Sequence, residues 1–275
     1  MPIVTDISRL SQVLSSGIFF IFSENDIFIT QGTALPTAET FRMCIHEGKT
    51  SAWYFETELD YTACMLKKDC KEIQGCSKMP LRQFFWDTKT ESEKHIGMHS
   101  KMGNLAARAH AFLRLNEVYV YCPSCGTKMQ TDETEAAKIC PHCGRKDFPH
   151  IEPAVIVLVK KGEEFLLVKN KNRTSDFYGC VSGFVEHGES LEECVKREVM
   201  EETGIAITNI RYAGSQAWPF PDQLMLAFTA DYKSGTIKMQ EEELDDADWF
   251  HKDKLPVIPR PGSVAYNLIM GCFDS

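Results

Sequence analysis

The stretch that decides the fold of this 275-residue chain is residues 183–205, GFVEHGESLEECVKREVMEETGI. Its spacing predicts a helix over 190–203 that ends at Gly204, the residue type expected just past a helix C-terminus. Three carboxylates, Glu198, Glu201 and Glu202, stand at positions i, i+3 and i+4 and therefore project from one helix face. A different stripe of the same helix carries apolar side chains that anchor it in a core, namely Leu191, Cys194, Val195 and Val199.

These carboxylates predict a site for divalent cations. Three adjacent carboxylates repel one another, and hard cations such as Mg²⁺ or Mn²⁺ neutralise that repulsion. Such metals keep open positions for water and for phosphate oxygens, which is what hydrolysis of a diphosphate requires. Arg197 is expected to pair with Glu189 and to orient the loop before the helix. The alternative is a solvated, salt-bridged helix, but such faces normally interleave both signs of charge.

The same stretch fits the pattern G-x5-E-x7-R-E-U-x-E-E-x-G-U, with U a bulky aliphatic residue, at all nine specified positions. This is the signature of the Nudix hydrolases, and the chain resembles that family. The resemblance implies an α/β fold, an α/β/α sandwich with a mixed sheet. It also implies that metals are held by Glu198, Glu201 and Glu202, together with Glu243 from the acidic run 241–243. Glu201 or Glu202 would act as the base.

Four cysteines form a second strong pattern. Cys122 and Cys125 make one C-x2-C pair, Cys140 and Cys143 make another, and 14 residues separate the pairs. Doubled pairs of this kind predict a closed, structural Zn²⁺ site. Free thiols are the alternative, and a redox pair is disfavoured because neither C-x2-C lies in a thioredoxin-like βαβ context. The segment between the pairs lacks the basic and aromatic interleaving of a nucleic-acid surface, which favours a structural bracket.

Residues 215–223, SQAWPFPDQ, resemble SQPWPFPxS, the tag of the NAD(H) pyrophosphatases, a Nudix subfamily that also removes NAD caps from RNA. Ala217 stands where the tag has proline, and Gln223 stands where it has serine. These two departures bear on substrate preference. The architecture of that subfamily, with a divergent N-terminal domain, a four-cysteine ribbon and a Nudix domain, also matches. The resemblance covers about residues 80–275 and extends only loosely to the rest.

This resemblance implies a set of substrate contacts. Phe184 would stack on a base, and Phe148 would add a second ring across a homodimer interface. Stacking of one base on an aromatic ring contributes roughly 1 to 3 kcal/mol. The other implied contacts are Gln216, Ala217, Trp218, Pro219, Phe220, Pro221, Asp222 and Gln223, with Ser182 and Ala265 beside them and Glu135 and Arg82 further along the chain.

Three domains are expected: an α+β domain over 1–116, a zinc ribbon over 117–150 and a Nudix domain over 151–275. In the first domain we expect a hairpin over 17–30, strands over 53–56 and 81–86, and a helix over about 94–116. In the last we expect strands over 153–160, 164–169, 178–182, 207–213, 224–232 and 247–250, and a helix over 263–271. The N-terminal strands could repeat the C-terminal fold, a point that the sequence leaves open.

Composition limits the class of protein. With 43% hydrophobic and 25% charged residues, the chain is typical of a globular protein. The net charge of −9 argues against a broad basic surface for nucleic acid. No apolar stretch approaches the ~20 residues of a membrane helix, and no export signal is apparent, so a cytoplasmic location without membrane contact is expected. Cysteines there are thiols or metal ligands.

The carboxylate helix predicts a metal-dependent hydrolase of a diphosphate, and the resemblance implies that it cleaves the pyrophosphate of NADH or NAD⁺ into NMN(H) and AMP. The resemblance implies that it also removes the 5′ NAD cap from RNA and that it works as a homodimer. One alternative is a pyrophosphatase for ADP-ribose or another nucleoside diphosphate derivative. An alternative of another class is a zinc-ribbon RNA-binding module with an inactive Nudix domain.

Overall fold

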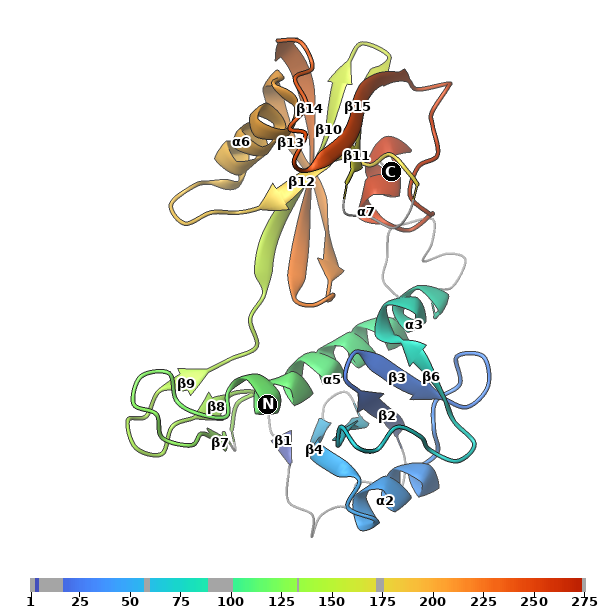
Figure 1. The fold of residues 1–275 in the computed structure, drawn as a ribbon, viewed down its shortest axis with the longest axis vertical. Helices are drawn as coiled ribbons and strands as arrows, with labels where there is room; N and C mark the ends of the chain where they lie inside the picture. Colours follow the sequence, from blue (N-terminus) through green and yellow to red (C-terminus); the bar gives the residue numbers. More distant parts are fainter. Residues whose placement is uncertain are drawn as a thin grey trace. The chain divides into compact units, whose positions relative to one another are not determined.

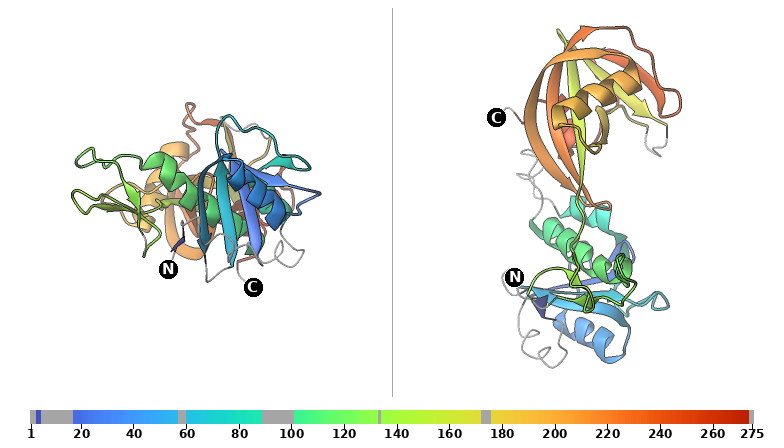
Figure 2. Two further views of the ribbon diagram at one scale, coloured as in Figure 1. Left: turned by 90° about the horizontal axis from the view of Figure 1, so that it is seen from below. Right: turned by 90° about the vertical axis from the view of Figure 1, so that its left-hand side faces the viewer.

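The computed structural model describes residues 3–4, 17–56, 60–88, 101–132, 134–171 and 176–273. The chain forms two compact units, drawn in Figures 1 and 2. One unit contains residues 1–89 and 100–150, and the other contains residues 90–99 and 151–275. The division of the first unit into an N-terminal domain and a ribbon at residue 117 stays a prediction.

The second unit is built on a mixed sheet with the strand order β13-β14-β10-β11-β15. Strands β14 and β10 run parallel, and the other neighbours are antiparallel. A further strand, β12 (Val181–Phe184), pairs with the first half of β10. The five strands of the order are β10 (Glu152–Lys161), β11 (Glu164–Asn170), β13 (Ala206–Trp218), β14 (Gln223–Ser234) and β15 (Leu244–His251).

Helices cover both faces of this sheet (Figure 1). Successive residues of a strand point to opposite faces. On β10, Val155 and Val157 pack in one core cluster with α6 (Leu191–Thr203), whereas Ala154 and Ile156 pack in another with α7 (Val264–Ile269). The expected sandwich of a mixed sheet between helices is therefore confirmed, and each predicted strand and helix overlaps an observed one. The strand predicted over 178–182 begins only at Val181, and β13 runs to Trp218, five residues past its predicted end.

Helix α6 is fixed at both ends by local interactions. The Ser190 side chain accepts a hydrogen bond from the Glu193 backbone N–H, and the Glu193 side chain accepts one from the Ser190 backbone N–H. This reciprocal cap satisfies two N–H groups that a helix start otherwise leaves without partners. At the other end Gly204 adopts a left-handed conformation with φ of 70°, which glycine adopts without steric cost. The apolar stripe with Cys194 and Val195 lies in the core, as predicted.

The N-terminal sheet has the order β1-β4-β5-β2-β3-β6. The expected hairpin is present as β2 (Ile18–Ser23) and β3 (Asp26–Ile29), and the expected strand over 53–56 lies in β4 (Thr50–Glu56). The helix expected over 94–116 is described as α5 (Lys101–Val118), and residues 94–100 fall outside the described part. The remaining elements are β1 (Ile3–Val4), α2 (Ala38–His46), β5 (Tyr61–Leu66), β6 (Ser77–Pro80) and α3 (Leu81–Asp87).

The strand predicted over 81–86 is wrong, because these residues form the helix α3. Its apolar residues suggested a buried strand by composition. However, Leu81, Phe84 and Phe85 stand at i, i+3 and i+4 and are all buried, which is the pattern of a helix face. Pro80 occupies the N-cap position immediately before the helix and makes no side-chain capping hydrogen bond.

The N-terminal sheet repeats the topology of the second unit. Strands β4, β5, β2, β3 and β6 have the same neighbours, the same directions and the same chain order as β13, β14, β10, β11 and β15. Helix α2 takes the place of α6 in the chain order. Its only carboxylate is Glu39, in the first turn, so it lacks the three-carboxylate face of α6. The N-terminal fold is thus a copy in topology without the acidic helix.

The ribbon in the first unit is a small three-stranded sheet. Its strands are β7 (Gln130–Thr131), β8 (Lys138–Ile139) and β9 (Lys146–Asp147), with β8 in the middle. Across the described parts of the chain, no helix is both long and apolar enough to span a membrane.

Candidate functional site

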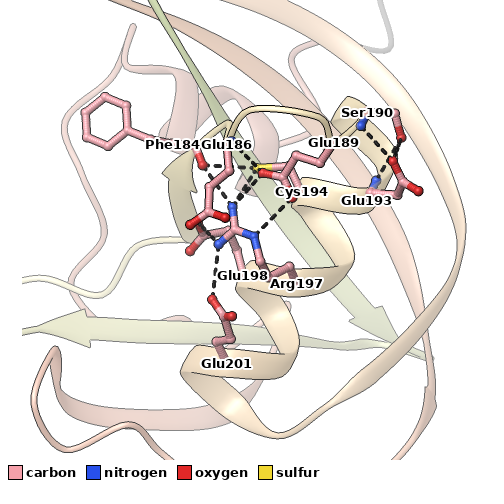
Figure 3. Close-up of polar contacts among 9 residues, drawn as sticks. All are labelled: Phe184, Glu186, Glu189, Ser190, Glu193, Cys194, Arg197, Glu198 and Glu201. Atoms are coloured by element: carbon pink, nitrogen blue, oxygen red, sulfur yellow. Dashed lines mark hydrogen bonds and ion pairs between the residues drawn. The ribbon is translucent and has the colours of Figure 1, made fainter.

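Arg197, in the middle of α6, joins polar side chains of the helix to those of the loop before it (Figure 3). Its Nε and Nη2 atoms donate to the two carboxylate oxygens of Glu189, at 3.0 and 2.7 Å, which is the expected pair between these residues. Nη2 also donates to the Phe184 carbonyl at 3.0 Å. The two bonds from Arg197 to Glu189, together with one from the Glu186 backbone N–H, lower the pKa of Glu189 to about 2. Arg197 therefore fastens the loop before α6 to the helix.

The third guanidinium nitrogen of Arg197, Nη1, lies between two of the predicted metal ligands. It donates to Glu198 at 2.7 Å and to Glu201 at 3.1 Å. A cationic group thus stands where the sequence predicts divalent cations. The Glu201 side chain is about half exposed, whereas Glu198 is nearly buried.

Glu198 is buried because a glycine makes room for it. A Cβ atom on Gly183 of β12 would lie 2.0 Å from the Glu198 carboxyl carbon. Burial raises the pKa of Glu198, and the nearby Glu201 and Glu243 raise it further against the lowering effect of Arg197. A carboxylate that is charged under these conditions needs more positive charge than Arg197 supplies.

The loop that carries Glu243 is attached to the end of α6. The Gln240 N–H donates to the Glu202 carbonyl at 3.0 Å. From the other side, the Lys171 backbone N–H donates to the Glu243 carbonyl at 2.8 Å, and its Nζ donates to the Glu241 carbonyl at 2.9 Å. These bonds hold Glu243 close enough to Glu198 for its negative charge to raise the pKa of Glu198. Sequence reasoning missed Lys171 because contacts with backbone carbonyls 70 residues away leave no local pattern.

The donors around α6 fit Mg²⁺ or Mn²⁺ by their chemistry. Glu198, Glu201, Glu202 and Glu243 offer only carboxylate oxygens, the ligands that these hard cations prefer. Glu202 is 2% exposed, so its carboxylate is placed in the protein interior rather than in bulk water. In this structure Arg197 contributes the positive charge, and the four carboxylates are not gathered as tightly as the cysteines of the ribbon.

The four cysteines of the ribbon lie together as predicted. Within the described residues, Cys122, Cys125, Cys140 and Cys143 are a group whose sulfur atoms all lie within 4.8 Å of one another. Three of the Sγ–Sγ distances are 3.5, 3.6 and 3.7 Å. Ligands 2.3 Å from a central Zn²⁺ in a tetrahedron are about 3.8 Å apart, so the thiols fit a structural zinc ion.

Most of the predicted substrate residues in the second unit share one face of the sheet. Ser182 and Phe184 of β12 pair with Ile156 and Ala154 and so point to the α7 side. On β13, Gln216 pairs with Met225, which packs in the same cluster. Trp218 and Ala265 also pack there. The predicted metal ligands on α6 lie on the opposite side, where Glu198 abuts Gly183 of β12.

The aromatic residues of the hairpin between β13 and β14 form a compact group. The rings of Trp218 and Phe220 meet edge to face with centroids 5.9 Å apart. The predicted contacts 216–218 belong to β13, 219–222 to the turn, and Gln223 begins β14. The remaining predicted contacts, Arg82 in α3 and Glu135 and Phe148 in the ribbon, belong to the first unit, where Glu135 pairs with Lys146 at 2.6 Å.

Comparison with known proteins agrees with this arrangement. The NUDIX domain family matches residues 150–268, and the NADH pyrophosphatase zinc ribbon domain matches residues 119–146. The chain is 42% identical over 198 residues to the NAD-capped RNA hydrolase NudC of Pseudomonas aeruginosa, covering 72% of this chain and 68% of that protein. It is 40% identical over 216 residues to the NAD-capped RNA hydrolase NudC of Pseudomonas syringae, covering 78% and 73%.

A solved structure, the NUDIX hydrolase of Nitrosomonas europaea, aligns with a TM-score of 0.44 at 20% identity, over 55% of this chain and 90% of that one. The acidic helix on a mixed sheet and the four-cysteine ribbon define a Nudix domain joined to a zinc ribbon. With relatives at 40% identity and above over more than two thirds of their length, the chain belongs to the NudC family of Nudix hydrolases.

Proposed function

We propose that this protein hydrolyses the pyrophosphate bond of NADH or NAD⁺ to give NMN(H) and AMP, and that it removes the 5′ NAD cap from RNA. The observation that carries the proposal is the carboxylate of Glu198, which is buried against Gly183 and whose pKa is raised by that burial, so that its charged form is stabilised by a bound cation. Water adds across the P–O–P bond in this reaction, so that both products end in a monophosphate. Capped RNA presents the same dinucleotide and would leave 5′-monophosphate RNA.

In this proposal Glu198, Glu201, Glu202 and Glu243 hold Mg²⁺ or Mn²⁺, which when bound neutralises the diphosphate and lowers the pKa of a water molecule. Glu201 or Glu202 accepts the proton of the attacking water. Arg197 and Glu189 are not needed for that transfer. They hold the loop and the helix start in register through the paired bonds at 2.7 and 3.0 Å.

The α7 side of the sheet receives the dinucleotide. The Phe184 side chain is 48% exposed and points away from the Arg197 cluster in Figure 3, so its face is available to a base. Trp218 and Phe220 supply a second aromatic surface on the hairpin. Ser182, Ala265 and the turn residues complete this side. Base stacking favours a dinucleotide over a bare diphosphate.

A second copy of the chain would complete the assembly as a homodimer in the cytoplasm. The ribbon and its flanks expose large apolar side chains, including Val118 at 58%, Tyr121 at 63% and Phe148 at 45%. Exposed apolar surface of this kind supports a protein interface. In the proposed dimer Phe148 offers a ring to the partner's dinucleotide, while Glu135 and Arg82 contact substrate.

The test is hydrolysis of NADH, ADP-ribose and 5′ NAD-capped RNA with Mg²⁺ or Mn²⁺, with products separated by chromatography. Glu202→Gln should abolish turnover, whereas Glu192→Gln, the same change at an exposed position of the same helix, should leave it intact. NMNH and AMP from NADH support the proposal, and rates rank free against capped substrate. Cleavage of ADP-ribose alone would assign the chain to the alternative activity, and RNA binding without any turnover would overturn the enzymatic reading.

A further inference from the structure

Gln216 is a buried polar residue whose side-chain amide donates one hydrogen bond and accepts another inside the protein. It is 1% exposed. Its Nε2 atom donates to the Gly262 carbonyl at 2.9 Å, and its Oε1 atom accepts from the Val264 N–H at 2.8 Å. One amide thus bonds both the carbonyl two residues before α7 and the N–H of the first residue of α7, which lie 46 and 48 positions away in the chain.

These bonds join two elements that carry proposed substrate contacts. Gln216 lies two residues before Trp218 at the end of β13, so it stands at the base of the hairpin. Val264 is the first residue of α7 and immediately precedes Ala265. A side chain that uses its amide in this way, and has almost no exposed surface, does not present that amide to a ligand.

We propose that Gln216 is a positioning residue, which sets the hairpin of Trp218 and Phe220 against the start of α7 and so shapes the dinucleotide site. This inference rests on the proposed function for the identity of the ligand. The metal ligands lie on the other side of the sheet, so loss of the Gln216 bonds changes dinucleotide binding and leaves metal binding as it was.

The first variant is Gln216→Met, which keeps the length of the side chain and removes both bonds. The second breaks the contact from the opposite side: Val264→Pro removes the N–H at the first helical position, where proline is well tolerated. The preceding Ser263 already has the extended conformation that proline favours in its neighbour, with φ −81° and ψ 150°. Val264→Ala, which keeps the N–H but trims the side chain, is the matched control.

Gln216→Met and Val264→Pro should each raise KM for NADH about tenfold, with kcat within about twofold, because lost uniform binding appears in KM alone. Val264→Ala should stay near the parent KM. In the double variant the increase should be smaller than the product of the two single increases, because both changes break one contact. The Kd for Mn²⁺ should be unchanged in all of them.

Hydrogen exchange of the ligand-free protein separates this inference from the proposed function. Peptides over 217–222 and 262–266 should exchange faster in Gln216→Met and Val264→Pro than in Val264→Ala. If the parent protein fails to cleave NADH, the proposed function is lost, while this measurement still reports on the contact of Gln216 with the start of α7. Unchanged exchange would show that this contact does not hold the hairpin in place. Faster exchange with an unchanged KM would show that the contact plays no part in substrate binding.

Discussion

The substitution Gly183→Ala tests whether Glu198 is the carboxylate around which the site is built. A Cβ atom at residue 183 would lie 2.0 Å from the Glu198 Cδ and Oε1 atoms and 2.2 Å from Oε2. Ordinary contact begins at 3.4 Å, so the carboxylate would have to move by about 1.4 Å. It cannot move freely, because Arg197 Nη1 holds Oε1 at 2.7 Å.

The magnitude follows from that displacement. A misplacement of about 1 Å in catalytic geometry can cost roughly 100-fold in rate, so kcat for NADH should fall by about that factor or more. Overpacking of a core costs roughly 1 to 3 kcal/mol, which a folded domain of this size tolerates. The Kd for Mn²⁺ should rise in parallel, since Glu198 is a proposed ligand.

The assay is NADH hydrolysis beside Mn²⁺ titration calorimetry and thermal unfolding, with Gly214→Ala as the matched control. Its Cβ would meet the Phe273 ring at 2.6 Å, so it adds a similar clash in the same sheet without touching Glu198. Gly214→Ala should lower the unfolding temperature while keeping the Mn²⁺ affinity. If Gly183→Ala keeps both rate and Mn²⁺ affinity, the assignment of Glu198 as a metal ligand is refuted.

Three further predictions follow from the charges and thiols. Burial raises the pKa of Glu198, so its charge destabilises the metal-free protein at neutral pH. Glu198→Gln should therefore raise the unfolding temperature measured without Mg²⁺ or Mn²⁺, and it should abolish the increase that Mn²⁺ causes. A lower unfolding temperature of the metal-free variant would contradict this prediction. Arg197 lowers the pKa of Glu189 from 4.5 to about 2, so the Glu189 carboxylate adds to the free energy of unfolding above pH 4.5, and this addition is lost as the pH falls toward 2. Urea unfolding of Glu189→Gln should therefore show a shallower pH dependence than the parent protein between pH 4.5 and 2. Cys125→Ser should lose bound zinc by elemental analysis, whereas Cys76→Ser, a half-buried thiol outside the ribbon, should retain it.

The sequence predicted the acidic helix and the four-cysteine ribbon because both depend on short spacings. A period of three to four residues places Glu198, Glu201 and Glu202 on one face whatever the rest of the chain does. The pair of Arg197 with Glu189 also followed, since both belong to one loop and helix. The strand predicted over 81–86 is wrong because a short apolar run fits either a strand or a buried helix, and only the i, i+3, i+4 spacing of Leu81, Phe84 and Phe85 distinguishes the two.

Contacts between segments that lie far apart in the chain could not be predicted from the sequence. The bonds of Gln216 with Gly262 and Val264, and of Lys171 with the carbonyls of 241 and 243, join segments far apart in the chain. No periodicity records such contacts. Likewise, the N-terminal repeat of the topology is visible only in the order and direction of its strands.

Strand β12 explains how one short segment serves both sides of the site. Because its side chains alternate, Ser182 and Phe184 point to the α7 side, whereas Gly183 faces α6 and leaves room for Glu198. The Phe184 carbonyl, in turn, accepts from Arg197 and ties this strand to the acidic helix. A one-residue slip of β12 along β10 would place a side chain beneath Glu198 and turn Phe184 away from the nucleotide side at the same time. The proposed metal ligand Glu198 and the proposed base-stacking residue Phe184 therefore both depend on the register of a single strand, so a change that shifts this register should weaken Mn²⁺ binding and NADH binding together.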